Sequence, residues 1–323
     1  MLQNRDFQLR MNYAYHAHRS QHMTQANWQN RTLFHGDNLK FLRAMNSESV
    51  DLIATDPPFN KSRDFHATPN TLASGAKFQD RWSWENDVHT PWVDQLTDDH
   101  GRLMYSILNA RYTHSDGMGA FLCFMAVRLL EMRRVLKSTG SIYLHCDPTA
   151  SHYLKLVMDA IFGHKNFVNE IIWHYQSGGR SNKYFPKKHD SILFYAKDIK
   201  FKVFNADKIS VPRNKCALCE NSLSKWNNMK KHTDHDGRIY RTIKSSGKMY
   251  KYYDDDPVLP SNVWLEFNHL QQRDPERTGY PTQKPCALYE RIINASSNKE
   301  NIVLDPFAGC ATTLIAAERL NRQ

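Results

Sequence analysis

Short apolar runs that end at a polar residue or a chain breaker recur along the sequence and predict buried strands. The clearest of them extends from Val50 to Thr55 and is followed by Asp56, Pro57 and Pro58. Neither proline has an N–H to donate to a strand partner, so we expect the strand to end before them. Further strands are predicted at residues 32–37, 141–148, 170–173, 191–196 and 301–305.

Apolar residues at helical spacing lie between these runs. Leu39, Leu42 and Met45 predict a short amphipathic helix, and the periodic stretch 121–137 predicts a long one. Further helices are predicted at 153–162 and 314–320. Strands that alternate with helices are typical of a doubly wound α/β domain, in which ligands bind at the carboxyl ends of the strands.

The loop after the strand at 50–55 offers hydrogen-bond acceptors beside a flat ring. Asp56 supplies carboxylate oxygens, and the Pro57 carbonyl has no neighbouring amide donor at Pro58. Phe59 adds an aromatic face for stacking. This set suits a planar heterocycle with an exocyclic NH2 group, whereas an ordinary strand-end turn is the alternative for the tetrapeptide alone.

A second acid ends the strand predicted near the end of the sequence. Asp305 leads into a turn of mostly small residues at 308–313, and the helix predicted at 314–320 follows. Small residues let the backbone approach a ligand closely, and the free N–H groups of a helix start attract polar ligand groups. The turn is therefore a second candidate binding element.

Three motifs together resemble the β class of S-adenosylmethionine-dependent DNA amino-methyltransferases, which modify adenine N6 or cytosine N4. Residues 56–59 resemble the Asp-Pro-Pro-Tyr/Phe loop of motif IV, which holds the flipped base. Residues 281–285 match the Pro-Thr-Gln-Lys-Pro signature of motif X. Residues 305–311 resemble motif I, although Ala311 stands at its second glycine. The order of the three motifs is that of the β class.

The resemblance implies roles for individual residues. The implied catalytic residues are Asp56, Pro57, Pro58 and Phe59. The implied contacts with S-adenosylmethionine are Asp37, Thr282, Gln283, Lys284, Pro285, Asp305, Pro306, Phe307, Gly309, Ala311, Thr312 and Thr313. For Asp37 the alternative is a simple helix N-cap, a position that favours Asp.

The resemblance also implies a Rossmann-like methyltransferase sheet with an inserted basic target-recognition region. The expected parts are an N-terminal arm at 1–30, a catalytic half at 31–199, the insertion at 200–270 and a cofactor-binding half at 271–323. Sheets of this family continue after the motif I helix into another strand, so we expect the cofactor-binding half to be truncated at Gln323.

Residues 60–119 lack clear periodicity and are rich in Gly, Ser, Asn and Trp. A long stretch of this kind is typical of a functional lid or of a disordered segment. We therefore expect a flexible lid that starts directly after the catalytic loop. Its aromatic residues close over the target base or, as an equal alternative, cap the core.

Positive charge is concentrated in one part of the chain. The formal net charge is +10, and residues 178–251 hold eighteen Lys and Arg against six Asp and Glu. Such a segment is the electrostatic footprint of phosphate contacts, with a solvated surface as the alternative. The predicted DNA-binding residues are Lys61, Arg180, Lys187, Lys188, Arg238, Arg241 and Lys244.

Cys216 and Cys219 are followed by His232 and His235, which is close to the spacing of a Cys2His2 zinc site. Only two residues separate the histidines, fewer than the usual three to five. Reduced cysteines and surface histidines are therefore favoured over zinc. Six cysteines in 323 residues are also too few for a disulfide scaffold.

No apolar run is long enough to cross a membrane, and the amino terminus has no apolar signal core. We therefore expect a cytoplasmic protein, and the resemblance implies a bacterium, an archaeon or a phage as its source. It also implies a homodimer and a cognate restriction endonuclease as further partners.

The function predicted from these motifs is methyl transfer from S-adenosylmethionine to N6 of a flipped adenine in double-stranded DNA. Adenine is preferred because Asp-Pro-Pro mostly accompanies it in this family. Cytosine N4 is the first alternative, and RNA or a protein glutamine amide is a more distant one. A DNA-binding module with a decayed active site is the alternative from another class, suggested by Ala311.

Overall fold

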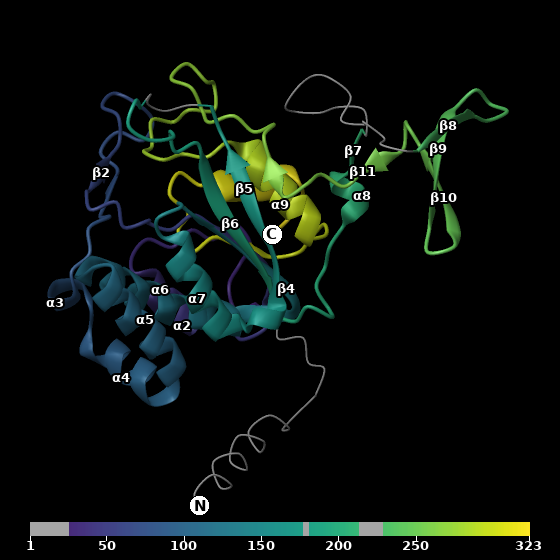
Figure 1. The fold of residues 1–323 in the computed structure, drawn as a ribbon. Helices are drawn as coiled ribbons and strands as arrows, with labels where there is room; N and C mark the ends of the chain where they lie inside the picture. Colours follow the sequence, from purple (N-terminus) through teal and green to yellow (C-terminus); the bar gives the residue numbers. More distant parts are fainter. Residues whose placement is uncertain (1–25, 177–180, 213–228) are drawn as a thin grey trace, which may run out of the picture.

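The structure is a computed structural model, and it describes residues 26–176, 181–212 and 229–323. Its centre is a six-stranded sheet of order β12-β5-β6-β4-β1-β13 (Figure 1). β6 runs antiparallel to the other five strands. The strands are β1 (Val50–Thr55), β4 (Leu136–Cys146), β5 (Phe167–His174), β6 (His189–Ala196), β12 (Val263–Trp264) and β13 (Val303–Leu304).

Helices cover both faces of the sheet, so the doubly wound α/β prediction is confirmed. Side chains alternate along β1, and Ile53 lies in one core while Leu52 lies in the other. The first core is covered by α2 (Asn38–Ala44), α6 (Asp116–Val135) and α7 (Ser151–Phe162). The second is covered by α9 (Cys286–Ser296) and α10 (Thr312–Arg319). In the described residues, no helix is both long and apolar enough to span a bilayer.

The long helix predicted at 121–137 is confirmed as α6, which begins earlier than expected. Ser115 caps it, because its hydroxyl accepts the N–H of Met118 at 3.1 Å. The helix ends at Val135, and β4 starts at the next residue. The short 3-10 turn η1 (His164–Asn166) then connects α7 to β5.

The expectation that residues 60–119 lack regular structure is wrong for most of their second half. Helices α4 (Thr90–Asp99) and α5 (Gly101–Thr113) form there, and the short helix α3 (Trp84–Asp87) directly precedes them. Trp92 and Leu96 on α4, and Leu103 and Ile107 on α5, are buried in the first core at i,i+4 spacing. The i,i+4 spacing of these apolar residues was the helix signal that the sequence prediction missed. The stretch from residue 60 to 83 contains only the short hairpin of β2 (Phe65–His66) and β3 (Lys77–Phe78).

The strand predicted at residues 32–37 is also wrong, although the helix predicted after it is confirmed as α2. Leu33 is 70% exposed, and Phe34 stacks on Phe41 with ring centroids 4.3 Å apart. A strand needs a ladder partner to be stable. In the described part of the chain, β13 forms one edge of the sheet and pairs only with β1, so residues 32–37 add no further strand at this edge.

The basic region contains a separate three-stranded antiparallel sheet that projects from the main body (Figure 1). Its strands are β8 (Lys230–Thr233), β9 (Ile239–Ser245) and β10 (Lys248–Tyr253). The predicted insertion at 200–270 also contains α8 (Ala206–Ile209) and the paired strands β7 (Val211–Pro212) and β11 (Pro257–Val258). β12, from the same range, belongs to the central sheet through its pairing with β5.

Candidate active site

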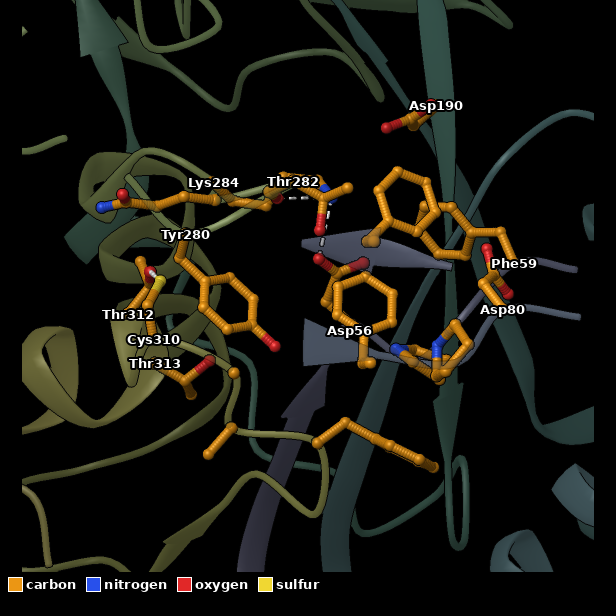
Figure 2. A pocket seen from close by; sticks show the side chains of 18 of the residues that line it. Asp56, Phe59, Asp80, Asp190, Tyr280, Thr282, Lys284, Cys310, Thr312 and Thr313 are labelled. Atoms are coloured by element: carbon orange, nitrogen blue, oxygen red, sulfur yellow. Dashed lines mark hydrogen bonds and ion pairs between the residues drawn. The ribbon is translucent and has the colours of Figure 1, made fainter. Parts of the chain in front are cut away.

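A cavity of about 490 Å³ opens where the loops after β1 and β13 meet. Its wall combines residues 56–59 after β1, 282–284 before α9 and 307–310 after β13 (Figure 2). Parallel strands end at the same edge of a sheet, and this edge is where α/β folds bind ligands. The structure thus brings together the three motifs that the sequence singled out.

Among the described residues, only one of the two carboxylate oxygens of Asp56 has a hydrogen-bond partner. Its Oδ2 receives a hydrogen bond from Nζ of Lys284 at 2.7 Å, and the Lys284 side chain is only 6% exposed. Lys284 also donates to the carbonyl of Thr282 at 3.3 Å. Oδ1 of Asp56 is buried and has no hydrogen-bond partner among the described residues. A buried acceptor without a donor is costly, so this atom is suited to a donor group of a ligand.

Phe59 lines the cavity beside the Asp56 carboxylate, and other side chains pack against part of its ring (Figure 2). It is 8% exposed and stacks on the ring of His145, with centroids 5.8 Å apart and an interplanar angle of 20°. Nζ of Lys284 lies 5.2 Å from the ring centroid. Phe59 therefore has a fixed position from which it can stack on a planar ligand.

The sequence analysis missed a buried polar group behind Phe59. Asp190 lines the cavity and accepts hydrogen bonds from Nε2 of His145 at 3.0 Å and from the Tyr175 hydroxyl at 3.1 Å. Burial acts to raise the pKa of Asp190, but the hydrogen bonds of His145 and Tyr175 and the charges of His145 and Lys284 together outweigh it and lower the pKa to about 2. The sequence did contain a signal for this group, because Tyr175 follows one predicted strand and Asp190 precedes another, at the edge of the sheet where ligands bind.

Asp305 follows β13 directly, is half-buried and lines the cavity. Its Oδ1 accepts the hydroxyl of Thr55 at 2.6 Å and the N–H of Phe307 at 3.1 Å. Burial raises the pKa of Asp305 to about 6, and the hydrogen bonds only partly offset this effect. This carboxyl group therefore titrates close to neutral pH.

The turn after Asp305 contains a residue in an unusual backbone conformation. Ala311, where motif I has a glycine, precedes α10 with φ 65° and ψ 26°, in the left-handed region. A side chain in this region costs about 1–2 kcal/mol. Gly309 also has a positive φ of 52°, and an added Cβ would lie 3.2 Å from the Tyr280 ring. Ala311 thus fits the turn under strain, and at Gly309 a side chain would add both a strained φ and a tight contact with Tyr280.

We expect Ala311→Gly to raise the free energy of unfolding by about 1 kcal/mol, because glycine adopts this backbone conformation without a steric penalty. Urea denaturation of the two proteins measures the difference. Ala308→Gly is the matched control, since Ala308 lies in the same turn without a positive φ. That control should lower stability by roughly 0.5–1 kcal/mol. A loss of stability in Ala311→Gly would contradict the assignment of strain.

A second cavity of about 960 Å³ adjoins the first and shares Asp305, Ala308, Gly309 and Thr313 with it. Of the remaining predicted cofactor contacts, Pro306 lines this second cavity, and Thr282, Gln283, Lys284, Phe307 and Thr312 line the first. Pro285, Ala311 and Asp37 line neither cavity.

Asp37 has hydrogen-bond and ion-pair partners within the chain. Its carboxylate caps α2 by accepting the N–H of Leu39 at 3.1 Å, and it pairs with the buried guanidinium of Arg128 at 2.8 Å. Asp37 is thus the N-cap of α2, and because the two roles can coexist, its contact with the cofactor stays a prediction. The neighbouring Asn38 lines the second cavity and donates to the Pro306 carbonyl at 2.8 Å.

The residues predicted to bind DNA differ in their availability. Lys61 and Lys187 line the first cavity, although Lys61 is paired with Asp147. Arg238 is paired with Asp255 and Asp256, and Arg241 with Asp254. Lys188 lies near the carbonyl of Gln176 at 3.4 Å, and Lys244 is exposed on β9. Arg180 lies outside the described residues.

The weak zinc candidate falls partly outside the described residues, because Cys216 and Cys219 are not among them. Of the two histidines, His232 lies within hydrogen-bonding distance of the Thr242 hydroxyl at 3.0 Å and stacks on Tyr240. His235 is largely exposed beside Asp236. Reduced cysteines and surface histidines therefore stay the prediction favoured over zinc.

A mostly parallel sheet that ends in an Asp-Pro-Pro-Phe loop opposite a small-residue turn defines a methyltransferase type of α/β domain. Residues 50–323 match the family model described as DNA methylase, and the chain belongs to this family. The resemblance predicted from the three motifs is confirmed.

The type II methyltransferase M.HpaI of Haemophilus parainfluenzae is 30% identical over 88% of this chain and 65% of its own length. The DNA adenine methyltransferase YhdJ of Escherichia coli K12 is 29% identical over 88% of this chain and 73% of its own. Among solved structures, the DNA modification methylase TTHA0409 of Thermus thermophilus is 17% identical, with coverages of 89% and 84% and a TM-score of 0.47. The chain thus spans just under two thirds of the length of M.HpaI.

Proposed function

We propose that this protein transfers a methyl group from S-adenosylmethionine to the N6 amino group of an adenine flipped out of double-stranded DNA. The observation that carries the proposal is the buried Oδ1 of Asp56, a cavity-lining acceptor without a partner among the described residues. Membership of the DNA methylase family and the similarity to a DNA adenine methyltransferase support the same reaction.

The residues after β1 can bind and activate the amino group of a flipped base. Oδ1 of Asp56 accepts one hydrogen of the amino group, the Pro57 carbonyl accepts the other, and Phe59 stacks on the ring. Two acceptors draw the nitrogen toward tetrahedral geometry and free its lone pair. The Asp56 carboxylate also stabilises the positive charge that develops on the nitrogen, so catalysis consists mainly of positioning and electrostatics.

The residues around the turn after β13 fit the cofactor. The two adjoining cavities share Ala308 and Gly309, so an elongated ligand can extend from one into the other along exposed backbone. When bound, S-adenosylmethionine supplies an electrophilic methyl group on its sulfonium. The residues that would hold it are Gly36, Asn38, Thr282, Asp305, Pro306, Phe307, Ala308, Gly309, Thr312 and Thr313.

We expect cofactor binding to depend on pH through Asp305. With a folded pKa of about 6, its carboxylate is ionised at pH 7.5 and can pair with the ammonium group of the cofactor. Protonation at lower pH removes the negative charge, so the Kd should rise as pH falls below 6, by up to about tenfold per pH unit. Calorimetric titration with S-adenosylmethionine between pH 5 and pH 7.5 measures this change.

Asp305→Asn is the control for this prediction, because the amide keeps the size of the side chain and removes its titration. The variant should bind weakly, with a Kd that changes little over the same pH range. A wild-type Kd that stays constant between pH 5 and pH 7.5 would contradict the proposed pairing.

The experiment that tests the function is transfer of labelled methyl groups to unmethylated duplex DNA, followed by identification of the modified nucleoside by mass spectrometry. N6-methyldeoxyadenosine is the expected product. N4-methyldeoxycytidine would keep the mechanism and change the base. Label in RNA or in protein glutamine, and none in DNA, would overturn the proposal. Failure both to label DNA and to bind S-adenosylmethionine would support the decayed DNA-binding module.

Double-stranded DNA is the partner we propose for the basic surface. Lys187 lies at the cavity and Lys244 on the projecting sheet, so phosphate contacts at both places would place a duplex across the cavity. Relatives of the chain include type II methyltransferases and Mod subunits of type III restriction-modification enzymes. We therefore propose a restriction-modification role in the bacterial cytoplasm, with a cognate endonuclease and a homodimer as further partners.

A further inference from the structure

The connection between β5 and β6 carries two exposed aromatic residues. Tyr184 is 68% exposed and Phe185 is 97% exposed, the highest value for any large apolar side chain in the described part of the chain. The hydroxyl of Ser181 accepts the backbone N–H groups of Lys183 and Tyr184, at 3.2 and 3.3 Å. The backbone that carries the aromatic pair thus begins in a hydrogen-bonded turn.

The same connection is rooted at the cavity. β5 is parallel to β1 in the sheet, so the chain leaves β5 at the edge where β1 ends. Tyr175 donates its N–H to the carbonyl of Lys188 at 3.0 Å, and this bond closes the base of the connection. Tyr175, Lys187 and Asp190 all line the cavity that contains Asp56. Phe185 is two residues from Lys187, which lines this cavity.

The charges around the aromatic pair suit a polyanion. Lys183 and Lys187 are exposed on either side of it, and Lys188 follows. Lysines at this spacing can contact phosphates of a DNA backbone while the rings between them face the bases.

We propose that Phe185 inserts into the DNA duplex and fills the gap that the flipped base leaves, with Tyr184 supporting it from the rim. This inference rests on the proposed function. A base that moves from the stack into the cavity leaves its two neighbours without a stacking partner, and an aromatic ring can stack on both. The insertion would favour the flipped state and thus raise the rate on paired DNA.

The test compares Phe185→Ala with the wild type on two duplexes that contain the site mapped by methyl labelling. In one the target base is correctly paired, and in the other it lies opposite a mismatch. On the paired duplex we expect kcat/KM to fall about ten- to a hundredfold, the effect expected from loss of aromatic stacking. On the mismatched duplex the loss should shrink to within about threefold, because a mismatched base leaves the stack more easily.

Tyr112→Ala is the matched control, because Tyr112 is 82% exposed on α5 and does not line the cavity. It should leave both rates unchanged. Equal losses for Phe185→Ala on the two duplexes, or no loss on either, would overturn the insertion while leaving methyl transfer by the wild type intact. A wild type that labels no DNA would overturn the proposed function and the insertion with it.

Discussion

Asp56→Asn is expected to lower kcat by about two to three orders of magnitude. Nζ of Lys284 lies against Oδ2 of Asp56, so the ammonium group will select the amide oxygen of an Asn at this position. The amide NH2 then takes the place of Oδ1 and faces the amino group of the base, donor against donor. The variant loses both the acceptor and the negative charge that stabilises the transition state. Single-turnover methyl transfer under saturating DNA and cofactor measures the change.

Asp51→Asn is the matched control for this variant. Asp51 lies on the same strand and also pairs with a lysine, Lys137, at 2.9 Å, and it accepts the N–H of Ile302. It does not line the cavity. The control should therefore lose stability but keep kcat within a few-fold of the wild type. An Asp56→Asn variant with kcat within tenfold of the wild type would remove Asp56 from the mechanism.

Much of the central sheet could be predicted from the sequence because its strands carry strong local signals. The run at 50–55 and its two prolines fix both the strand and its end, and the structure has β1 within the same bounds. The strand predicted at 301–305 is confirmed as the shorter β13. The three motifs lie at the carboxyl ends of strands or beside them. They meet at one edge of the sheet because parallel strands end at the same edge.

The rest of the site depends on contacts that the sequence does not encode locally. The pair of Lys284 and Asp56 joins residues 228 positions apart, and the bond of His145 to Asp190 joins positions 45 apart. Residues 32–37 have the composition of a strand, but a strand also needs a hydrogen-bonded partner strand. Local sequence pattern does not reveal whether such a partner exists. In the same way, local pattern does not reveal the ion pairs of Arg238 and Arg241 with acidic residues, and the DNA contacts of both arginines stay a prediction.

Lys284→Met is expected to lower the free energy of unfolding by about 3 kcal/mol, because it leaves a largely buried carboxylate without its cation. The Asp56 side chain is only 18% exposed, so water replaces the lost partner poorly. The same variant should lower kcat, because the Asp56 carboxylate is then free to rotate away from the base. Urea denaturation and single-turnover methyl transfer measure the two effects.

A double-mutant cycle separates the ion pair from the packing of the lysine chain. Lys284→Met combined with Asp56→Asn removes both charges, so part of the lost stability should return and the coupling free energy should exceed about 1 kcal/mol. Lys137→Met with Asp51→Asn is the parallel cycle at the other end of β1. It should show coupling in stability without an effect on kcat, because that pair lies outside the cavity. If the effects at positions 56 and 284 are simply additive, Lys284 does not hold Asp56, and the unpartnered Oδ1 must owe its position to the strand alone.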